Sequence, residues 1–281
     1  MTTIKAFIKN HPILSYYALT FAISWGGILL VIGGPRGIPG KPDQFLKMLP
    51  VLLLAMLAGP TVAGLLLTGL VHGRPGLRDL LSRLLRWRVS LRWYAVALLT
   101  APLLFTAIPL AISLLFPKFL PGIFAAENKA SLLAMGTAAG LSTIFEELGW
   151  TGFAIPRLRL RYGMLATGLI VGALWGAWHL LVNFWSSGTP SGALSLSQLL
   201  TSLFFSFGIL PAYRVLMVWV NDRTESVLIA WLMHAVLTAS NVILGPLVTP
   251  GMTGPIWSLV MGAALWLVIA AVAAANRGQL P

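Results

Sequence analysis

The chain has 281 residues, of which 58% are hydrophobic and only 9% are charged, and its mean hydropathy is +0.88. Such a chain would not dissolve as an ordinary globular domain, because its apolar runs are longer than a soluble core helix requires. The absence of cysteine excludes a disulfide framework, a thiolate metal site and a cysteine nucleophile. We therefore expect a polytopic membrane protein.

Eight apolar runs are long enough to cross a bilayer as helices of about 20 residues. They predict an all-α bundle that forms a single membrane domain over residues 1–281. The Gly59–Pro60 pair inside the second run predicts a kink. In chain order, the predicted spans are 13–33, 48–71, 93–116, 130–156, 164–185, 196–219, 225–245 and 254–275.

Lysine and arginine predict which side of the membrane each end of the chain occupies. With a cytoplasmic N-terminus, fourteen of them fall in inner segments and five in outer segments, which is a positive-inside bias. We expect a multi-pass protein of the cell (inner) membrane with both termini cytoplasmic. The inner set is Lys5, Lys9, Arg74, Arg78, Arg83, Arg86, Arg88, Arg92, Arg157, Arg159, Arg161, Arg214, Arg223 and Arg277.

The net charge of +12 fits this topology and contact with anionic lipid. No nucleic-acid-binding motif accompanies the charge, so we expect no nucleic-acid partner. Residues 73–92, where leucines alternate with arginines, predict a basic amphipathic segment on the cytoplasmic surface.

Two adjacent carboxylates, Glu146 and Glu147, lie inside the fourth predicted span. A charge at bilayer depth costs about 2.5–3.5 kcal/mol on insertion scales, so this pair is a functional-site hypothesis. Neighbouring residues of a helix point about 100° apart, and the two carboxylates therefore need different roles. His179 in the fifth span and His234 in the seventh are their ionisable partners.

Other polar side chains lie within two helical turns of these four residues, on the same faces of their helices. Converging helices would enclose a wet pocket, and residues 130–245 form the predicted catalytic core. The supporting candidates are Thr151 after Glu147, Asn183 after His179, and Thr238 and Asn241 after His234; Trp150, Trp175 and Trp178 would line the pocket.

Such a pocket can hydrolyse a peptide bond in two ways. Glu146 would deprotonate a water for attack on the carbonyl, while His234 steadies the oxyanion. Alternatively, Glu146, His179 and His234 would hold a zinc ion whose fourth position stays open for water. Spacing does not choose between these two mechanisms, and zinc is the cofactor that the second one implies. The expected partners are a peptide or membrane-protein substrate and membrane lipids.

Three motifs in order carry a family resemblance: residues 146–153 (EELGWTGF) with Pro156-Arg157-Leu158 behind them, residues 175–179 (WGAWH), and His234-Ala235. They resemble the CPBP (Abi) family of CAAX prenyl endopeptidases and bacteriocin-processing or self-immunity membrane proteins. The resemblance implies that Glu146 activates water with Glu147 in support. It also implies that His179 belongs to the activating or metal-binding set and that His234 binds the oxyanion or a metal.

The chain departs from the family pattern at two positions. Thr151 stands where the pattern E-E-x-x-x-R has arginine, and Thr238 stands where asparagine is common. A threonine hydroxyl can donate a hydrogen bond to Glu147 but cannot neutralise it. Either a cation approaches from elsewhere, with Arg157 the nearest in sequence, or Glu147 stays protonated.

We therefore expect an intramembrane endopeptidase, of the glutamate or metal-dependent type, that cuts near the inner leaflet. One alternative is a non-catalytic immunity or scaffold protein that binds a hydrophobic peptide or membrane partner, which the two threonines favour. A third possibility is a proton-coupled transporter. Helix rise places Glu146 about 15 Å and His234 about 14 Å from the inner end of their spans, but His179 about 22 Å. The fifth helix must therefore be tilted or begin later.

Overall fold

The computed structural model describes residues 3–246 and 252–275, and in these ranges the chain is helical, with two isolated β-bridges and no strand. The predicted all-α membrane bundle is confirmed. Seven helices are long and apolar enough to cross a membrane within the described ranges. These spans are Pro12–Val31, Lys47–Leu84, Leu91–Ser113, Met164–Ser186, Leu196–Thr224, Val227–Leu244 and Thr253–Ala275.

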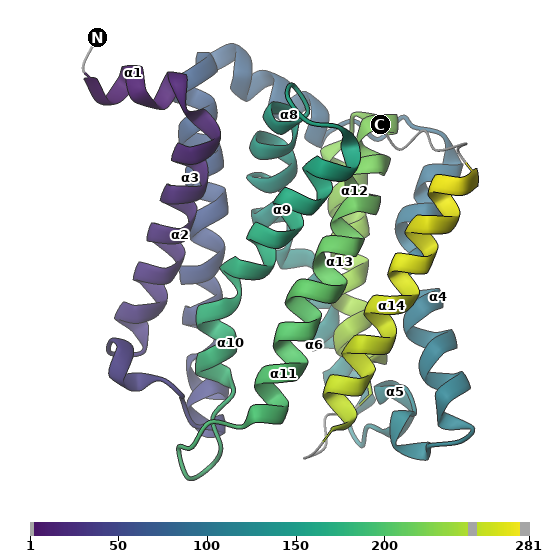
Figure 1. Cartoon of the computed structure of the whole chain (residues 1–281). Helices are drawn as coiled ribbons and strands as arrows, with labels where there is room; N and C mark the ends of the chain where they lie inside the picture. The colour runs from purple at the N-terminus through teal and green to yellow at the C-terminus, as the bar shows by residue number, and fades with distance from the viewer. Residues whose placement is uncertain (1–2, 247–251, 276–281) are drawn as a thin grey trace.

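The predicted fourth span, 130–156, is helical but divided into four short pieces. These are α6 (Lys129–Ser142), α7 (Ile144–Glu147), a π-helical turn called η3 (Trp150–Ala154) and α8 (Ile155–Leu158). In Figure 1 this segment begins at the end of the bundle where α5 (Gly122–Ala125) lies and finishes with α8 at the opposite end. It therefore completes an eighth crossing, although no single helix spans it.

The remaining elements follow the predicted order. The other helices are α1 (Thr3–Asn10), α2 (Pro12–Val31), α3 (Pro42–Leu84), α4 (Leu91–Ser113), α9 (Met164–Trp178), α10 (Leu180–Ser186), α11 (Leu196–Phe204), α12 (Leu210–Thr224), α13 (Val227–Leu244) and α14 (Thr253–Ala275), with short turns η1 (Pro35–Gly37), η2 (Pro117–Phe119) and η4 (Phe205–Ile209). Three helices, α6, α11 and α13, begin with a side-chain cap. The caps are Asn128, Ser195 and Ser226, each of which accepts a hydrogen bond from the backbone N–H three residues later.

The long helix α3 changes direction near its end. Its backbone keeps helical angles through the predicted kink at Gly59–Pro60, and the break comes at Gly73, whose φ is +64°. Glycine adopts this left-handed region without a steric penalty. Beyond the break, the helix folds across the end of the bundle and finishes at Leu84 (Figure 1). The predicted basic segment, 73–92, is thus helical in its first part and a turn from Leu85 to Ser90.

The two described ends of the chain lie at the same end of the bundle. Figure 1 shows α1 and the last turn of α14 there, as an even number of crossings requires. Which end faces the cytoplasm stays a prediction from charge, and Arg277, one of the counted cations, lies outside the described residues.

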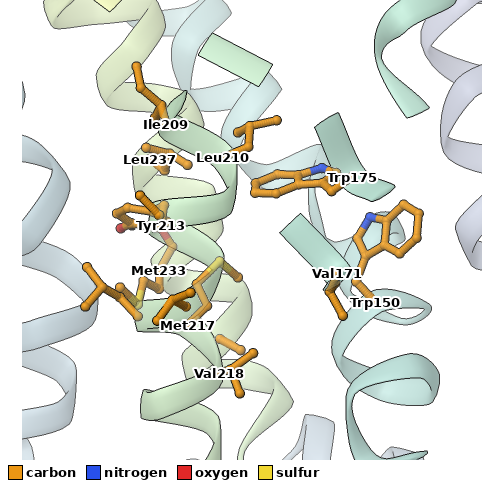
Figure 2. Close-up of a cluster of buried hydrophobic side chains, with 14 of the residues drawn as sticks. Trp150, Val171, Trp175, Ile209, Leu210, Tyr213, Met217, Val218, Met233 and Leu237 are labelled. Carbon is orange, nitrogen blue, oxygen red and sulfur yellow. Dashed lines mark hydrogen bonds between the residues drawn. The ribbon is translucent and has the colours of Figure 1, made fainter. Parts of the chain in front are cut away.

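The buried core lies between α9, α12 and α13. Figure 2 shows Tyr213, Met217 and Met233 close together on two neighbouring helices, with Trp150 and Trp175 across from them. The hydroxyl of Tyr213 donates to the carbonyl oxygen of Met233 at 3.0 Å. Helix α9 packs along α12.

Candidate active site

A cavity of about 270 Å³ opens among α3, α6, α7, α9, α10 and α13. Glu146, His179 and His234 all line it, so the structure brings the three ionisable candidates to one space. Its other polar lining residues include Ser142, Thr143, Thr238 and Asn241, and its apolar wall comes from Phe45, Leu49, Leu52, Leu53, Met56, Leu57, Ala139, Trp175, Trp178, Val182, Phe205, Leu210 and Leu237.

Glu146 presents one carboxylate oxygen to the protein and the other to the cavity. The indole N–H groups of Trp150 and Trp175 donate to its Oε2, at 3.3 and 2.8 Å. No side chain or backbone group in the described part of the chain donates to its Oε1. This second oxygen is therefore free to accept a proton from a cavity water.

Glu147 is fully buried and is absent from the cavity lining. Arg214 Nη1 donates to its two oxygens at 2.9 and 3.0 Å. His234 Nδ1 lies 2.8 Å from Oε1, and the hydroxyl of Thr151 donates to Oε2. The two adjacent glutamates thus have different surroundings, and Glu147 joins α7 to α12 and α13.

Arg214 is the site residue that the sequence reasoning missed. It was counted among the inner-surface cations, but it is fully buried in the core on α12. Its guanidinium carbon also lies 4.1 Å from the centroid of the Trp175 ring, a cation–π contact. An arginine within the apolar run of the predicted sixth span was the available signal, by the same argument that singled out Glu146.

Arg157, the cation suggested for Glu147, does not approach it. Its Nη1 donates to the carbonyl oxygen of Phe153, and its guanidinium carbon lies 3.4 Å from the centre of the Phe153 ring. Arg157 lines a different cavity at the end of the bundle. The cation beside Glu147, which the pattern E-E-x-x-x-R would place at position 151, comes here from α12.

The two histidines use Nδ1 to fix their rings. His179 Nδ1 lies 2.9 Å from the carbonyl oxygen of Trp175, which can only accept, so this nitrogen carries a proton. His234 Nδ1 donates to Glu147. In both rings, Nε2 is then the nitrogen left for a ligand in the cavity.

Trp175 contacts four of the site residues, Glu146, His179, His234 and Arg214. Its indole N–H binds Glu146, its carbonyl oxygen binds His179, and its ring centroid lies 4.7 Å from that of His234. The guanidinium of Arg214 lies against the same ring. Since Trp175 is almost completely buried, it sets the distances between these groups.

The depth of His179 is explained by the path of its helix. Figure 1 shows α9 running obliquely across the bundle, and the helix is interrupted at His179, where α10 takes over. The tilt that the sequence required is present. It brings His179 to the same cavity as Glu146 and His234 although it lies further along its helix.

The supporting candidates separate into two groups. Thr238 and Asn241 line the cavity on α13, below His234. Asn183 does not, because its amide donates to the hydroxyl of Ser206 at 2.9 Å and ties α10 to η4. Thr151 acts on Glu147 and not on the cavity.

A zinc ion would need Glu146, His179 and His234 as a ligand set. Within residues 3–246 and 252–275, no three His, Cys, Asp or Glu side chains are grouped closely enough to hold a metal ion. The side chains of Glu146, His179 and His234 therefore do not fit a metal ion in this arrangement. Metal dependence stays a prediction, which metal analysis of the purified protein tests.

The fold and the site define a multi-pass α-helical membrane protein with a buried Glu–His cluster. Residues 127–240 match the family model of the type II CAAX prenyl endopeptidase Rce1-like proteins. A segment of 104 residues is 26% identical to CAAX prenyl protease 2 of Methanococcus maripaludis, covering 37% of this chain and 38% of that protein. These findings confirm the resemblance to the CPBP family, over the region that carries the three motifs.

Proposed function

We propose that this protein is an intramembrane endopeptidase in which Glu146 activates the attacking water. The observation that carries the proposal is the free Oε1 of Glu146, in a cavity that two imidazole rings share. A carboxylate whose other oxygen is held by two indole donors is fixed in orientation, as a general base must be. The family match and the name of the archaeal relative support the same reaction class.

In the proposed reaction, a water in the cavity gives a proton to Glu146 Oε1 and attacks the carbonyl carbon of the scissile peptide. The carbonyl oxygen becomes an oxyanion, and Glu146 then passes the proton to the leaving amine as the C–N bond breaks. His234, when protonated on Nε2, donates to the oxyanion, and the Thr238 hydroxyl one turn below is the second donor. Glu147 orients His234 through Nδ1.

The walls of the cavity indicate a lipophilic substrate. Apart from the Glu–His cluster and a few polar groups, they are apolar side chains, mostly leucine, phenylalanine and tryptophan. Helix α6 packs along α13, whereas α3 contacts the fourth crossing at α7 and η3. Between α3 and α6, the side chains of Leu53, Leu57 and Ser142 line the cavity and are partly exposed. We propose that a substrate reaches Glu146 laterally from the lipid.

The cavity extends away from the end of the bundle that carries α1. Thr61 on α3 donates to the carbonyl oxygen of Phe145, beside Glu146, and the lining residues of α3 lie below it, from Leu57 to Phe45. The helix from Thr61 to Phe45 rises about 24 Å. If α1 is cytoplasmic, the scissile bond lies at the depth of Glu146 and the rest of the substrate extends toward the outer leaflet.

The test is cleavage by purified protein of a farnesylated CAAX-type peptide and of the same peptide without the lipid. Glu146→Gln should lower the cleavage rate by about 10²–10⁴-fold, the range for loss of a general base. The glutamine oxygen can still accept from Trp150 and Trp175, so the fold should persist. Glu127→Gln, at an exposed acid outside the cavity, is the matched control.

Undiminished cleavage by Glu146→Gln would refute the role of Glu146. If the wild-type protein binds the peptide without cleaving it, the non-catalytic scaffold is supported instead. Of the two threonines that favour the scaffold, only Thr238 still does so, because Arg214 supplies to Glu147 the positive charge that Thr151 lacks. Uptake coupled to a pH gradient in liposomes would support the transporter.

A further inference from the structure

A second and larger cavity lies at the end of the bundle where α8 is found. Its volume is about 730 Å³, and it shares no lining residue with the cavity of Glu146. The part of α3 around the Gly73 break forms one wall, η3 and α8 form another, and the end of α12 closes it. The proposed protease reaction makes no use of this space.

The charges around this cavity form three ion pairs and leave one cation over. Arg83 pairs with Asp79 at 2.9 Å, Arg86 with Glu225 at 2.5 Å and Arg159 with Asp222 at 2.9 Å. All six line the cavity, and so does Arg157. In the described part of the chain, Arg157 forms no ion pair, so the lining carries an uncompensated positive charge there.

Arg157 is held in place without being neutralised. One Nη1 hydrogen bond to the Phe153 carbonyl and the Phe153 ring fix the guanidinium, and its other N–H groups find no partner within residues 3–246 and 252–275. Partial burial, followed by the nearby charge of Arg83, lowers the pKa of Arg157 to about 10, and the carboxylate of Asp79 only partly opposes this shift. It is still charged at neutral pH, and a cation in such surroundings favours an anionic ligand.

The surroundings of the cavity are those of a membrane interface. Beyond Gly73, the helix of α3 lies across the bundle end (Figure 1). Leu77 and Leu81 on this part of the helix, and Leu85 just after it, are exposed. Leu160, at the cavity itself, is 83% exposed. Arginines that face inward beside leucines that face outward suit a ligand with a charged head and apolar chains.

We propose that this cavity binds the phosphate group of an anionic phospholipid, with Arg157 as its principal contact. The phosphate oxygens accept from the free N–H groups of Arg157, and the acyl chains run along the exposed leucines beside it. A phosphodiester with a single charge matches Arg157, the one arginine of this cavity lining that forms no ion pair among the described residues. Free inorganic phosphate offers the same oxygens without the apolar contact.

The experiment measures lipid binding to the full-length protein in detergent, by native mass spectrometry and by the shift in melting temperature. The probes are phosphatidylglycerol, phosphatidylcholine and inorganic phosphate. Wild type should retain one phosphatidylglycerol in preference to phosphatidylcholine, and Arg157→Gln should weaken that binding by about tenfold or more. Arg161→Gln removes an exposed arginine three residues after Leu158 that lies outside the cavity, and it should leave binding unchanged.

Equal phosphatidylglycerol binding by wild type and Arg157→Gln, or an equal loss in Arg161→Gln, would overturn the proposal. If only inorganic phosphate raises the melting temperature, and Arg157→Gln abolishes that rise, the cavity binds phosphate but its ligand is a free ion and not a lipid. Should Arg157→Gln not fold, Arg157→Lys decides, because lysine keeps the charge but loses the planar fork and should still weaken binding.

Discussion

Arg214 Nη1 lies 2.9 Å from one oxygen of Glu147 and 3.0 Å from the other, and neither side chain has any exposed surface. The pair connects α7 to α12 in the middle of the bundle, directly behind the candidate catalytic residues. A buried pair of this kind is costly to break, because the partner that remains is an uncompensated charge.

Arg214→Leu should therefore lower the free energy of unfolding by about 3–5 kcal/mol. Adding Thr151→Arg should restore much of the loss, because the Thr151 hydroxyl already contacts Glu147 and arginine is the residue of the family pattern at this position. Thermal unfolding of the purified variants measures both effects. If the double variant is no more stable than Arg214→Leu, an arginine at position 151 does not replace Arg214 as the partner of Glu147.

The control for this loss is an exposed ion pair. Lys47 and Asp43 lie 3.6 Å apart with most of both side chains in solvent. Lys47→Gln should change stability by no more than about 1 kcal/mol, since exposed pairs contribute little. If Lys47→Gln lowers the free energy of unfolding as much as Arg214→Leu does, the effect comes from the detergent and not from the burial of the ion pair.

Trp175→Phe tests the indole hydrogen bond to Glu146. Phenylalanine keeps a ring against Arg214 and His234 but loses the N–H that donates at 2.8 Å. Because a hydrogen bond to a charged group contributes about 1.5–3 kcal/mol, we expect kcat/KM for peptide cleavage to fall at least tenfold.

The matched control is Trp219→Phe. The indole N–H of Trp219 has no hydrogen-bond partner among the described residues, and its ring packs against Trp93, away from the cavity. Cleavage should be unchanged in this variant. An equal loss in both tryptophan variants would assign the effect to ring size and not to Glu146.

Gly140→Ala should separate α6 from α13. A Cβ at Gly140 would lie 2.5 Å from the carbonyl oxygen of Ala235, next to His234. Overpacking of this kind costs about 1–3 kcal/mol, so the melting temperature should fall. Gly26→Ala, where a Cβ meets nothing within 4 Å, should instead leave stability equal or slightly higher.

Thr238 is expected to serve as the second oxyanion donor. Thr238→Val keeps the shape of the side chain but removes its hydroxyl, and it should lower kcat about 10²-fold with little change in KM. Thr238→Asn restores a donor and should retain activity. Full activity of the valine variant would remove Thr238 from the mechanism and leave His234 as the only candidate donor.

The sequence predicted the helical bundle and singled out three side chains, Glu146, His179 and His234, that line one cavity, because apolar runs and isolated charges are local signals. Glu146 stood out since its position within a span is costly for any carboxylate. Arg214 was missed because its charge was counted as a topological anchor although it lies inside the predicted sixth span; the packing of α12 against α9 shows that it is buried.

The breaks in the fourth crossing also could not be predicted from the local sequence pattern. Hydropathy alone describes residues 130–156 as one apolar helix, whereas the structure interrupts it around Glu146 and Glu147 and follows them with a π-helical turn at Trp150. Such turns occur where function or tertiary contacts override helix regularity. Hydrogen bonds from Trp175, Arg214 and His234, on other helices, hold the carboxylates there.

Because of the Glu147–Arg214 pair, two crossings of this protein depend on each other to enter the bilayer. A translocon that released the segment around Glu147 alone would leave a bare carboxylate in hydrocarbon, at about 2.5–3.5 kcal/mol. Arg214, which arrives some seventy residues later in synthesis, removes that penalty. The nascent chain should therefore hold its fourth crossing at the insertion machinery until its sixth has been made.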